Sequence, residues 1–176
     1  MRIALAVLAL ASLVTASSSG AAQPAKEAGL CSPTEEEIFV CKTAKALAYV
    51  CASKPFKPDV SVMQYRFGSP GKIQLQYPAS PALAAGHFRM SSTAYSGGGE
   101  GHLAFSNDGY DYILYDRTTA GDWDKQGHRA HTFATGILVR KGKAIVSNIA
   151  CQRADDTLRA GAYDLPKEDF NYDAVP

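Results

Sequence analysis

The position of the last of four cysteines is the feature that most constrains the fold. Cys31, Cys41 and Cys51 lie ten residues apart near the start of the chain, whereas Cys151 follows a hundred residues later. If all four are oxidised, Cys151 must join one of the first three and tie the end of the fold to its beginning. Such a bridge closes a loop of about 100 residues and stabilises the fold by roughly 4–5 kcal/mol in the chain-entropy account. The sequence leaves three pairings open.

The first 22 residues have the layout of a secretory signal peptide. A positively charged start precedes an almost purely apolar run from Ile3 to Val14, and small residues follow. The run spans about a dozen residues, which is too short for a transmembrane helix of about 20 residues. We therefore expect cleavage after Ala22, with Ala16 as the alternative, and a mature protein in the periplasm or the medium without a membrane anchor.

The charge balance excludes one broad class of partner. Removal of the signal peptide takes away one of the 18 basic residues, Arg2, and leaves 17 basic residues against 17 acidic ones. A general nucleic-acid binder needs an excess of basic residues. No nucleic-acid partner is therefore expected.

Short strands broken by turns dominate the chain from about residue 36 to residue 151. In the clearest strand, Ile73, Leu75 and Tyr77 alternate with polar residues, so these three side chains are predicted to face the core. The β-branched and aromatic segment 60–67 precedes this strand, and the turn at 68–71 completes a hairpin. Further strands are predicted at 87–95, 101–106, 110–116, 132–140 and 143–151, with tight turns at 107–109 and 141–142.

The segment 34–51 is compatible with two structures. It contains no glycine or proline, and Thr34 with Glu37 could form the capping box of a helix. Alternatively, the β-prone stretches 38–42 and 46–51 form a hairpin. We favour the hairpin.

Together these segments give eight or so strands with short antiparallel links and no helix between them. The sequence therefore predicts an all-β fold with disulfides, either a small barrel or a two-sheet sandwich. The predicted organisation is a signal peptide at 1–22, a flexible lead-in at 23–35, one β domain at 36–151 and a polar C-terminal tail at 152–176.

A glycine-rich stretch is the most unusual part of the chain. It lacks the lysine and the following helix of a phosphate-binding loop. Glycine allows the backbone to approach another surface closely, so the stretch is expected to be an exposed loop that either links two strands or contacts a partner. The residues of this candidate binding loop are Ser96, Gly97, Gly98, Gly99 and Glu100.

A second candidate contact is the polar stretch 118–128, which is predicted to be a long loop. It holds the only tryptophan of the chain, Trp123. Tryptophan is enriched at the energetically dominant positions of interfaces. The Trp123 ring could therefore contact a partner, or it could fold back over the core.

No residue set forms a specific catalytic signature. Ser96, His102 and Asp108 could be named as a hydrolytic trio, but the chain has no Gly-x-Ser-x-Gly elbow. Glu100 could be paired with Asp108 or Asp111 for glycoside cleavage, although the spacing is not specific. We favour a non-enzymatic protein without a cofactor.

Metal binding is also not expected. The cysteines form no Cys-x-x-Cys motif. His128 and His131 lie three residues apart, so they would point to opposite faces of a strand rather than to a common ion.

Several short motifs follow one another in order over residues 36–151. They are the ten-residue cysteine spacing, Tyr65-Arg66-Phe67-Gly68, Lys72-Ile73-Gln74-Leu75, Tyr95-Ser96-Gly97 and the closing Cys151. This layout resembles that of small exported bacterial β proteins, and it also resembles the periplasmic lysozyme inhibitors of the C-type and I-type kinds. The second resemblance implies a small antiparallel β protein that inserts a Ser-Gly loop into the active-site cleft of a lysozyme and engages its catalytic carboxylates.

Only the start of the inhibitor loop carries over to this chain. Ser96 and Gly97 match it, but the tyrosine that follows in the family falls on Gly99 or Glu100 here. We therefore expect an exported binding protein of the bacterial envelope whose partner is a lysozyme or another envelope protein or glycan. The alternatives are a secreted hydrolase of cell-wall or glycan material and a carbohydrate-binding envelope module that stacks sugars on Trp123.

Overall fold

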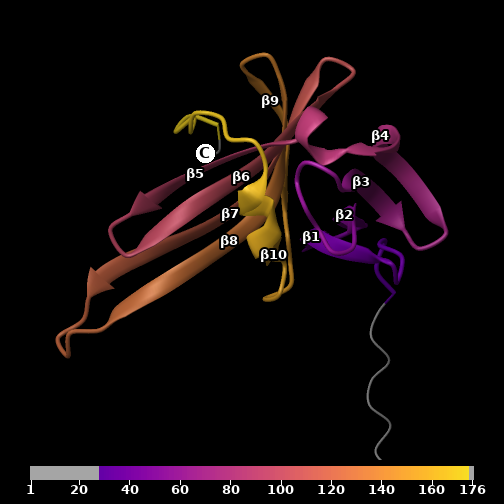
Figure 1. Cartoon of the computed structure of the whole chain (residues 1–176). Coiled ribbons are helices and arrows are strands. Elements are labelled where there is room, and N and C mark those ends of the chain that lie inside the picture. Colours follow the sequence, from indigo (N-terminus) through magenta and orange to yellow (C-terminus); the bar gives the residue numbers. More distant parts are fainter. Residues whose placement is uncertain (1–27, 175–176) are drawn as a thin grey trace, which may run out of the picture.

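The computed structural model describes residues 28–174, which form two antiparallel β-sheets packed around a shared core (Figure 1). The predicted signal peptide, residues 1–22, lies outside the described residues, as do positions 23–27 of the predicted lead-in. Between residues 28 and 174 no helix is long and apolar enough to cross a membrane.

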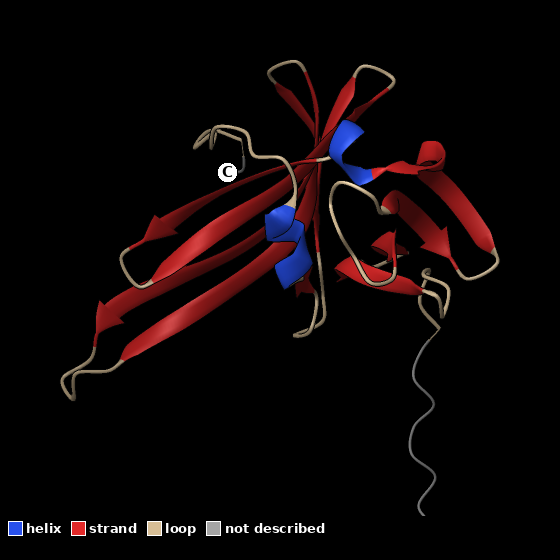
Figure 2. Cartoon of the chain, viewed as in Figure 1, coloured by secondary structure: helices blue, strands red, loops and turns tan. Residues whose placement is uncertain are grey.

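Each sheet has five strands. The first has the order β10-β1-β2-β3-β4 and the second the order β5-β6-β7-β8-β9, and two short 3-10 helices complete the fold (Figure 2). The elements are β1 (Glu35–Lys42), β2 (Leu47–Ser53), β3 (Val62–Ser69), β4 (Lys72–Leu83), η1 (Ala84–Gly86), β5 (Arg89–Tyr95), β6 (Gly98–Asn107), β7 (Tyr110–Trp123), β8 (Arg129–Lys141), β9 (Ala144–Ala150), β10 (Thr157–Leu158) and η2 (Ala160–Asp164).

This arrangement confirms the predicted all-β class and selects the sandwich over the barrel, because the two sheets remain separate. The favoured hairpin at 34–51 is also confirmed, as β1 pairs with β2. Thr43 closes its turn, since the hydroxyl accepts a hydrogen bond from the Ala46 amide at 3.0 Å. The tight turn between β6 and β7 follows from Asp108 and Gly109, which have φ angles of 51° and 77°.

The core lies between the two sheets and is rich in aromatic rings. Phe105 of β6 is fully buried and stacks against Tyr77 of β4, with ring centroids 4.7 Å apart. Leu75 and Tyr77 pack against the core as the alternation predicts. The prediction was wrong for Ile73, which is 40% exposed. Ile73 lies at the hairpin end of β4, where the register with β3 shifts between Phe67 and Gly68.

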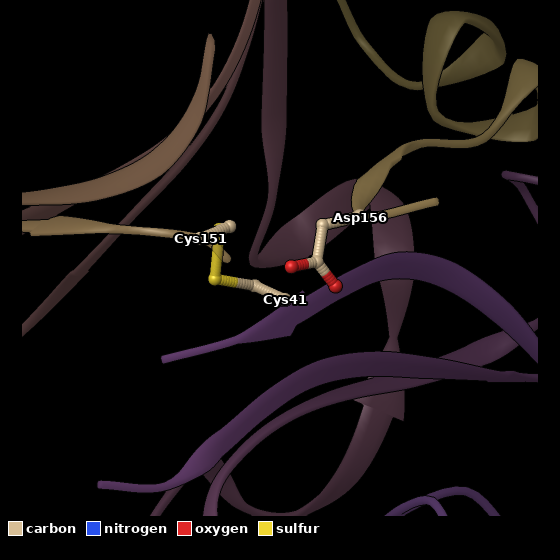
Figure 3. A group of neighbouring side chains, drawn as sticks. All are labelled: Cys41, Cys151 and Asp156. Atoms are coloured by element: carbon tan, nitrogen blue, oxygen red, sulfur yellow. A yellow bond between two sulfur atoms is a disulfide. The ribbon is translucent and has the colours of Figure 1, made fainter. Parts of the chain in front are cut away.

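Two disulfides use all four cysteines. Cys31 is joined to Cys51, and Cys41 on β1 is joined to Cys151 at the end of β9, which links the two sheets (Figure 3). Two disulfides indicate an oxidising compartment outside the cytoplasm. Asp156 lies beside the second bridge, but both sulfurs there are oxidised and offer no thiolate to a metal ion.

The chain after Cys151 packs onto both sheets. Asp156 fixes its start, because the carboxylate accepts the Lys42 amide at 3.0 Å. β10 pairs with β1, and Leu165 is buried after η2. Residues 166–174, which we call the C-terminal strap, then run beside β5 and over the outer face of its sheet. The Glu168 amide donates to the Met90 carbonyl at 3.0 Å, and Ala174 is buried.

The second sheet extends well beyond the core. The ends of β5 to β8 that project from the body, residues 93–99 and 117–134, form what we call the hairpin arm (Figure 1). One sequence-based prediction was wrong here and another was right only in part. The stretch 118–128 is not a long loop, because β7 continues to Trp123 and only 124–128 turn. Within the glycine-rich stretch, Ser96 and Gly97 form the exposed turn that links β5 to β6, whereas Gly98, Gly99 and Glu100 belong to β6. Most of the arm is exposed on both faces, so its strands need no apolar alternation.

Candidate functional site

At the end of the hairpin arm the β5–β6 turn lies against the last residues of β7, and Arg129 joins the two. Its guanidinium donates from Nε to the Gly121 carbonyl at 2.8 Å and from Nη2 to the Ala120 carbonyl at 3.2 Å. The remaining nitrogen, Nη1, reaches the Ser96 carbonyl in the β5–β6 turn at 3.4 Å. We call Ser96, Gly97, Trp123 and Arg129 the tip.

Trp123 is the largest apolar side chain of the tip. It pairs in register with Arg129, and the guanidinium carbon lies 5.2 Å from the centre of its ring. The side chain is nevertheless 67% exposed. A cation over one face holds the indole in place, and the exposed remainder offers an aromatic surface to a partner.

Gly97 is required by the close approach of the β5–β6 turn to β7 and β8. Its φ angle is +83°, a conformation that other L-residues rarely adopt. A β-carbon at this position would lie 2.8 Å from the Ala120 β-carbon and 2.9 Å from Arg129 Nη1. The glycine therefore allows the Ser96–Gly97 turn to lie directly against the neighbouring hairpin.

The turn between β7 and β8 is closed by the side chain of Asp124. Asp124 Oδ1 accepts the backbone amides of Gln126 at 2.9 Å and His128 at 2.8 Å. These hydrogen bonds, the one from His128 first, lower the pKa of Asp124. The turn is thus a locally capped structure, which fixes the strand ends that carry Trp123 and Arg129.

Glu100 lies away from the tip and is 5% exposed, although the sequence placed it in the binding loop. Its carboxylate accepts hydrogen bonds from Tyr95 Oη at 2.7 Å and from Arg117 at 2.7 and 3.0 Å. His102 Nε2 lies 2.7 Å from the second oxygen. Phe170 of the strap stacks on the His102 ring at 4.5 Å and covers the cluster.

The pKa directions define the charge state of this buried cluster. Burial by itself would raise the pKa of Glu100, but the hydrogen bonds from Arg117, His102 and Tyr95 outweigh it and lower the pKa. Burial lowers the pKa of His102, and the contact with Glu100 opposes this without reversing it. Burial and the hydrogen bond to Glu100 raise the pKa of Tyr95 to about 12. Glu100 is therefore ionised and His102 neutral near pH 7.

The structure brings together Ser96, Gly97 and Trp123 of the predicted binding residues and separates the others from them. Gly98 and Gly99 belong to β6, where they pair with Tyr95 and Ala94 of β5. The possible trio of Ser96, His102 and Asp108 does not assemble, because Ser96 and Asp108 flank opposite ends of the ten-residue strand β6.

Sequence reasoning missed Arg129 as a functional residue. Nothing in the sequence around Arg129 distinguishes it. If the strand pairing of β7 and β8 had been predicted as far as the turn, Arg129 would have been placed opposite Trp123. Comparison of the chain with protein-family models, with curated proteins and with solved structures gives no match.

Proposed function

We propose that the protein is an exported, non-enzymatic binding protein of the bacterial envelope that contacts a partner protein through the tip of its hairpin arm. The observation that carries the proposal is the exposed Trp123, fixed by Arg129 beside the Ser96–Gly97 turn at the far end of a projecting sheet. An ordered aromatic side chain loses little conformational entropy on binding, which favours its use as an interface anchor.

A lysozyme is the partner that we put first. The tip lies where the β5–β6 turn meets the paired ends of β7 and β8, and it projects from the body, which suits insertion into an enzyme cleft. Ser96 is exposed in the turn, and a serine hydroxyl can donate a hydrogen bond to a catalytic carboxylate. Arg129 adds a cation that favours approach to an acidic cleft.

The hydrolase alternative has weaker support. Its proposed acid, Glu100, is buried under the strap, and three side chains stabilise its ionised form. A general acid near neutral pH needs a raised pKa, whereas the pKa of Glu100 is lowered. A carbohydrate-binding role remains the second candidate, because the exposed part of the Trp123 ring could stack on a sugar.

The test is inhibition of chicken-, goose- and invertebrate-type lysozymes by the purified, oxidised protein. We expect inhibition of one type, and Trp123→Ala should weaken it at least tenfold, as for an interface hot spot. Ser96→Ala should weaken it less. Val146→Ala, which changes an exposed apolar residue of β9 outside the arm, is the matched control and should leave inhibition unchanged.

The outcomes separate the two candidates. If no lysozyme type is inhibited at micromolar protein, the lysozyme proposal fails. A change of Trp123 fluorescence on titration with peptidoglycan fragments would then support the carbohydrate-binding role. Loss of lysozyme inhibition in Val146→Ala to the same degree as in Trp123→Ala would show that the tip is not the contact surface.

A further inference from the structure

A second concave site lies far from the tip, between the outer face of the second sheet and the C-terminal strap. It is a cleft of about 320 Å³, near the lower end of the size range of small-molecule sites. Strands β5 to β8 form its floor, where Ala104 and Ile113 supply apolar surface, and the strap forms its other wall.

Three polar side chains that line this cleft have polar atoms without partners. Arg140 Nε is buried and makes no hydrogen bond with any described residue. Ser91 is 3% exposed, and its hydroxyl has no hydrogen-bond partner among residues 28–174. His102 is also 3% exposed, and within the same range only its Nε2 is engaged, by Glu100. Buried polar groups are nearly always satisfied, so Arg140 Nε calls for a partner that the described chain does not supply. The Ser91 hydroxyl and His102 Nδ1 are open to the cleft, where a ligand can replace solvent as their partner.

The chemistry of His102 Nδ1 follows from its neighbours. The Glu100 carboxylate can only accept hydrogen bonds, so the proton of the neutral imidazole resides on Nε2. Nδ1 consequently presents a lone pair to the cleft and can accept a hydrogen bond from a donor there. The charged groups that face the ring are Glu100 of β6, Arg117 of β7 and Glu168 of the strap.

Unpaired charges of both signs line the cleft. Arg140 and Asp111 lie opposite each other in the register of β7 and β8, yet Arg140 forms no ion pair within the described chain. The Asp111 carboxylate accepts only the Ser106 hydroxyl, and Asp169 of the strap has no partner between residues 28 and 174. Arg89 and Glu168, by contrast, neutralise each other at 2.7 Å. The cleft therefore offers one cation for an anion and two carboxylates for a cation.

We propose that this cleft binds a small zwitterion, a free α-amino acid, whose carboxylate pairs with Arg140 and whose ammonium group is held by His102 Nδ1 and the rim carboxylates. Guanidinium–carboxylate hydrogen bonds are among the strongest that a protein makes with a small ligand. The aliphatic part of the ligand lies against Ala104 and Ile113. This site shares no residue with the tip, so it stands independently of the function proposed above.

The test is calorimetric titration and thermal unfolding of the purified, oxidised protein with a panel of free L-amino acids. At least one should bind in the micromolar to millimolar range and raise the unfolding temperature. The corresponding amine without the carboxylate, and acetate without the ammonium group, should bind at least tenfold more weakly. Binding no tighter than that of acetate would overturn the proposal, and so would the absence of any response at about 10 mM amino acid.

Variants assign the contacts. Arg140→Gln should weaken binding at least tenfold, and Ser91→Ala, a smaller change at a buried position, should weaken it by a lesser factor. Lys143→Gln removes the same charge from the same hairpin outside the cleft and should bind as the wild type does. Equal losses in Arg140→Gln and Lys143→Gln would refute the site. Trp123→Ala should retain amino-acid binding, which separates this proposal from the function of the tip.

Discussion

Glu100 and Arg117 lie directly opposite each other on β6 and β7. Two nitrogens of Arg117 donate hydrogen bonds to the Glu100 carboxylate, at 2.7 and 3.0 Å. Glu100→Gln would remove the carboxylate charge from this contact. We expect the free energy of unfolding to fall by about 2 kcal/mol, less than for a fully buried pair because the Arg117 side chain is 24% exposed. Urea unfolding followed by circular dichroism measures the change.

A matched control for this variant is Glu168→Gln. It breaks the ion pair with Arg89, in which both side chains are much more exposed. The expected loss is below about 1 kcal/mol. Equal losses in Glu100→Gln and Glu168→Gln would contradict the importance that we assign to the buried pair.

The buried histidine should make stability depend on pH above the range in which carboxylates titrate. The pKa of His102 is lowered in the folded protein, so below about pH 6.5 the unfolded chain takes up a proton that the folded chain does not. The free energy of unfolding should therefore fall between pH 7 and pH 5. The contribution of Glu100, whose pKa is also lowered, is present above about pH 4.3 and is lost as the pH falls through its folded-state value.

Chemical unfolding at a series of pH values measures this dependence. His102→Gln should reduce the slope between pH 7 and pH 5. His131→Gln, which changes an exposed histidine of the arm, should keep the wild-type slope. An unchanged slope in His102→Gln would show that another group is responsible.

The two disulfides should differ in their contribution to stability. Cys41 and Cys151 are 110 residues apart in sequence, whereas Cys31 and Cys51 are 20 apart. In the chain-entropy account, replacing the long-range bridge by alanines costs about 5 kcal/mol and replacing the short one about 3 kcal/mol. Urea midpoints of the two double variants test the ranking, and the reverse order would show that native-state effects outweigh the loop length.

Alanine substitutions at Gly97 and Gly71 should distinguish the cost of backbone strain from the cost of steric contact. Both have positive φ angles, +83° and +78°, but a β-carbon at Gly71 would meet no atom within 4 Å. Gly71→Ala should cost about 1 kcal/mol, the strain alone. Gly97→Ala must also displace Ala120 or Arg129, so we expect a loss of about 2 kcal/mol or more and weaker binding through the tip. Equal losses in thermal unfolding would mean that the β5–β6 turn can move away from Ala120 and Arg129.

The sequence predicted the parts of the fold in which one face of a strand is buried. Leu103 and Phe105 alternate with more polar neighbours, and Asp108-Gly109 encodes its turn locally, so β6 and its connection to β7 were recognisable. The projecting parts of β7 and β8 were not, because a strand exposed on both faces has no apolar period. Its hydrogen bonds to the neighbouring strand determine its conformation instead.

The candidate site could be predicted from the sequence only in part, for a related reason. Ser96, Gly97 and Trp123 stand out by residue type, but their proximity depends on Arg129, which has no distinguishing sequence context. Glu100 was misplaced because glycines surround it, and only its contacts with Arg117 and His102 show that its side chain is buried beneath the strap. Contacts between separate hairpins are long-range, and local sequence patterns do not predict them.

The connectivity of the two disulfides has a consequence for how the protein matures. Cys41 stands between Cys31 and Cys51 in the chain, yet it pairs with Cys151. If thiols were oxidised in the order in which they emerge from a translocation channel, Cys31 would first be joined to Cys41, a bridge that the finished fold does not contain. Under that order of oxidation, the native pairing would be reached by reshuffling through thiolate attack, and an isomerase rather than a simple oxidase would determine the yield.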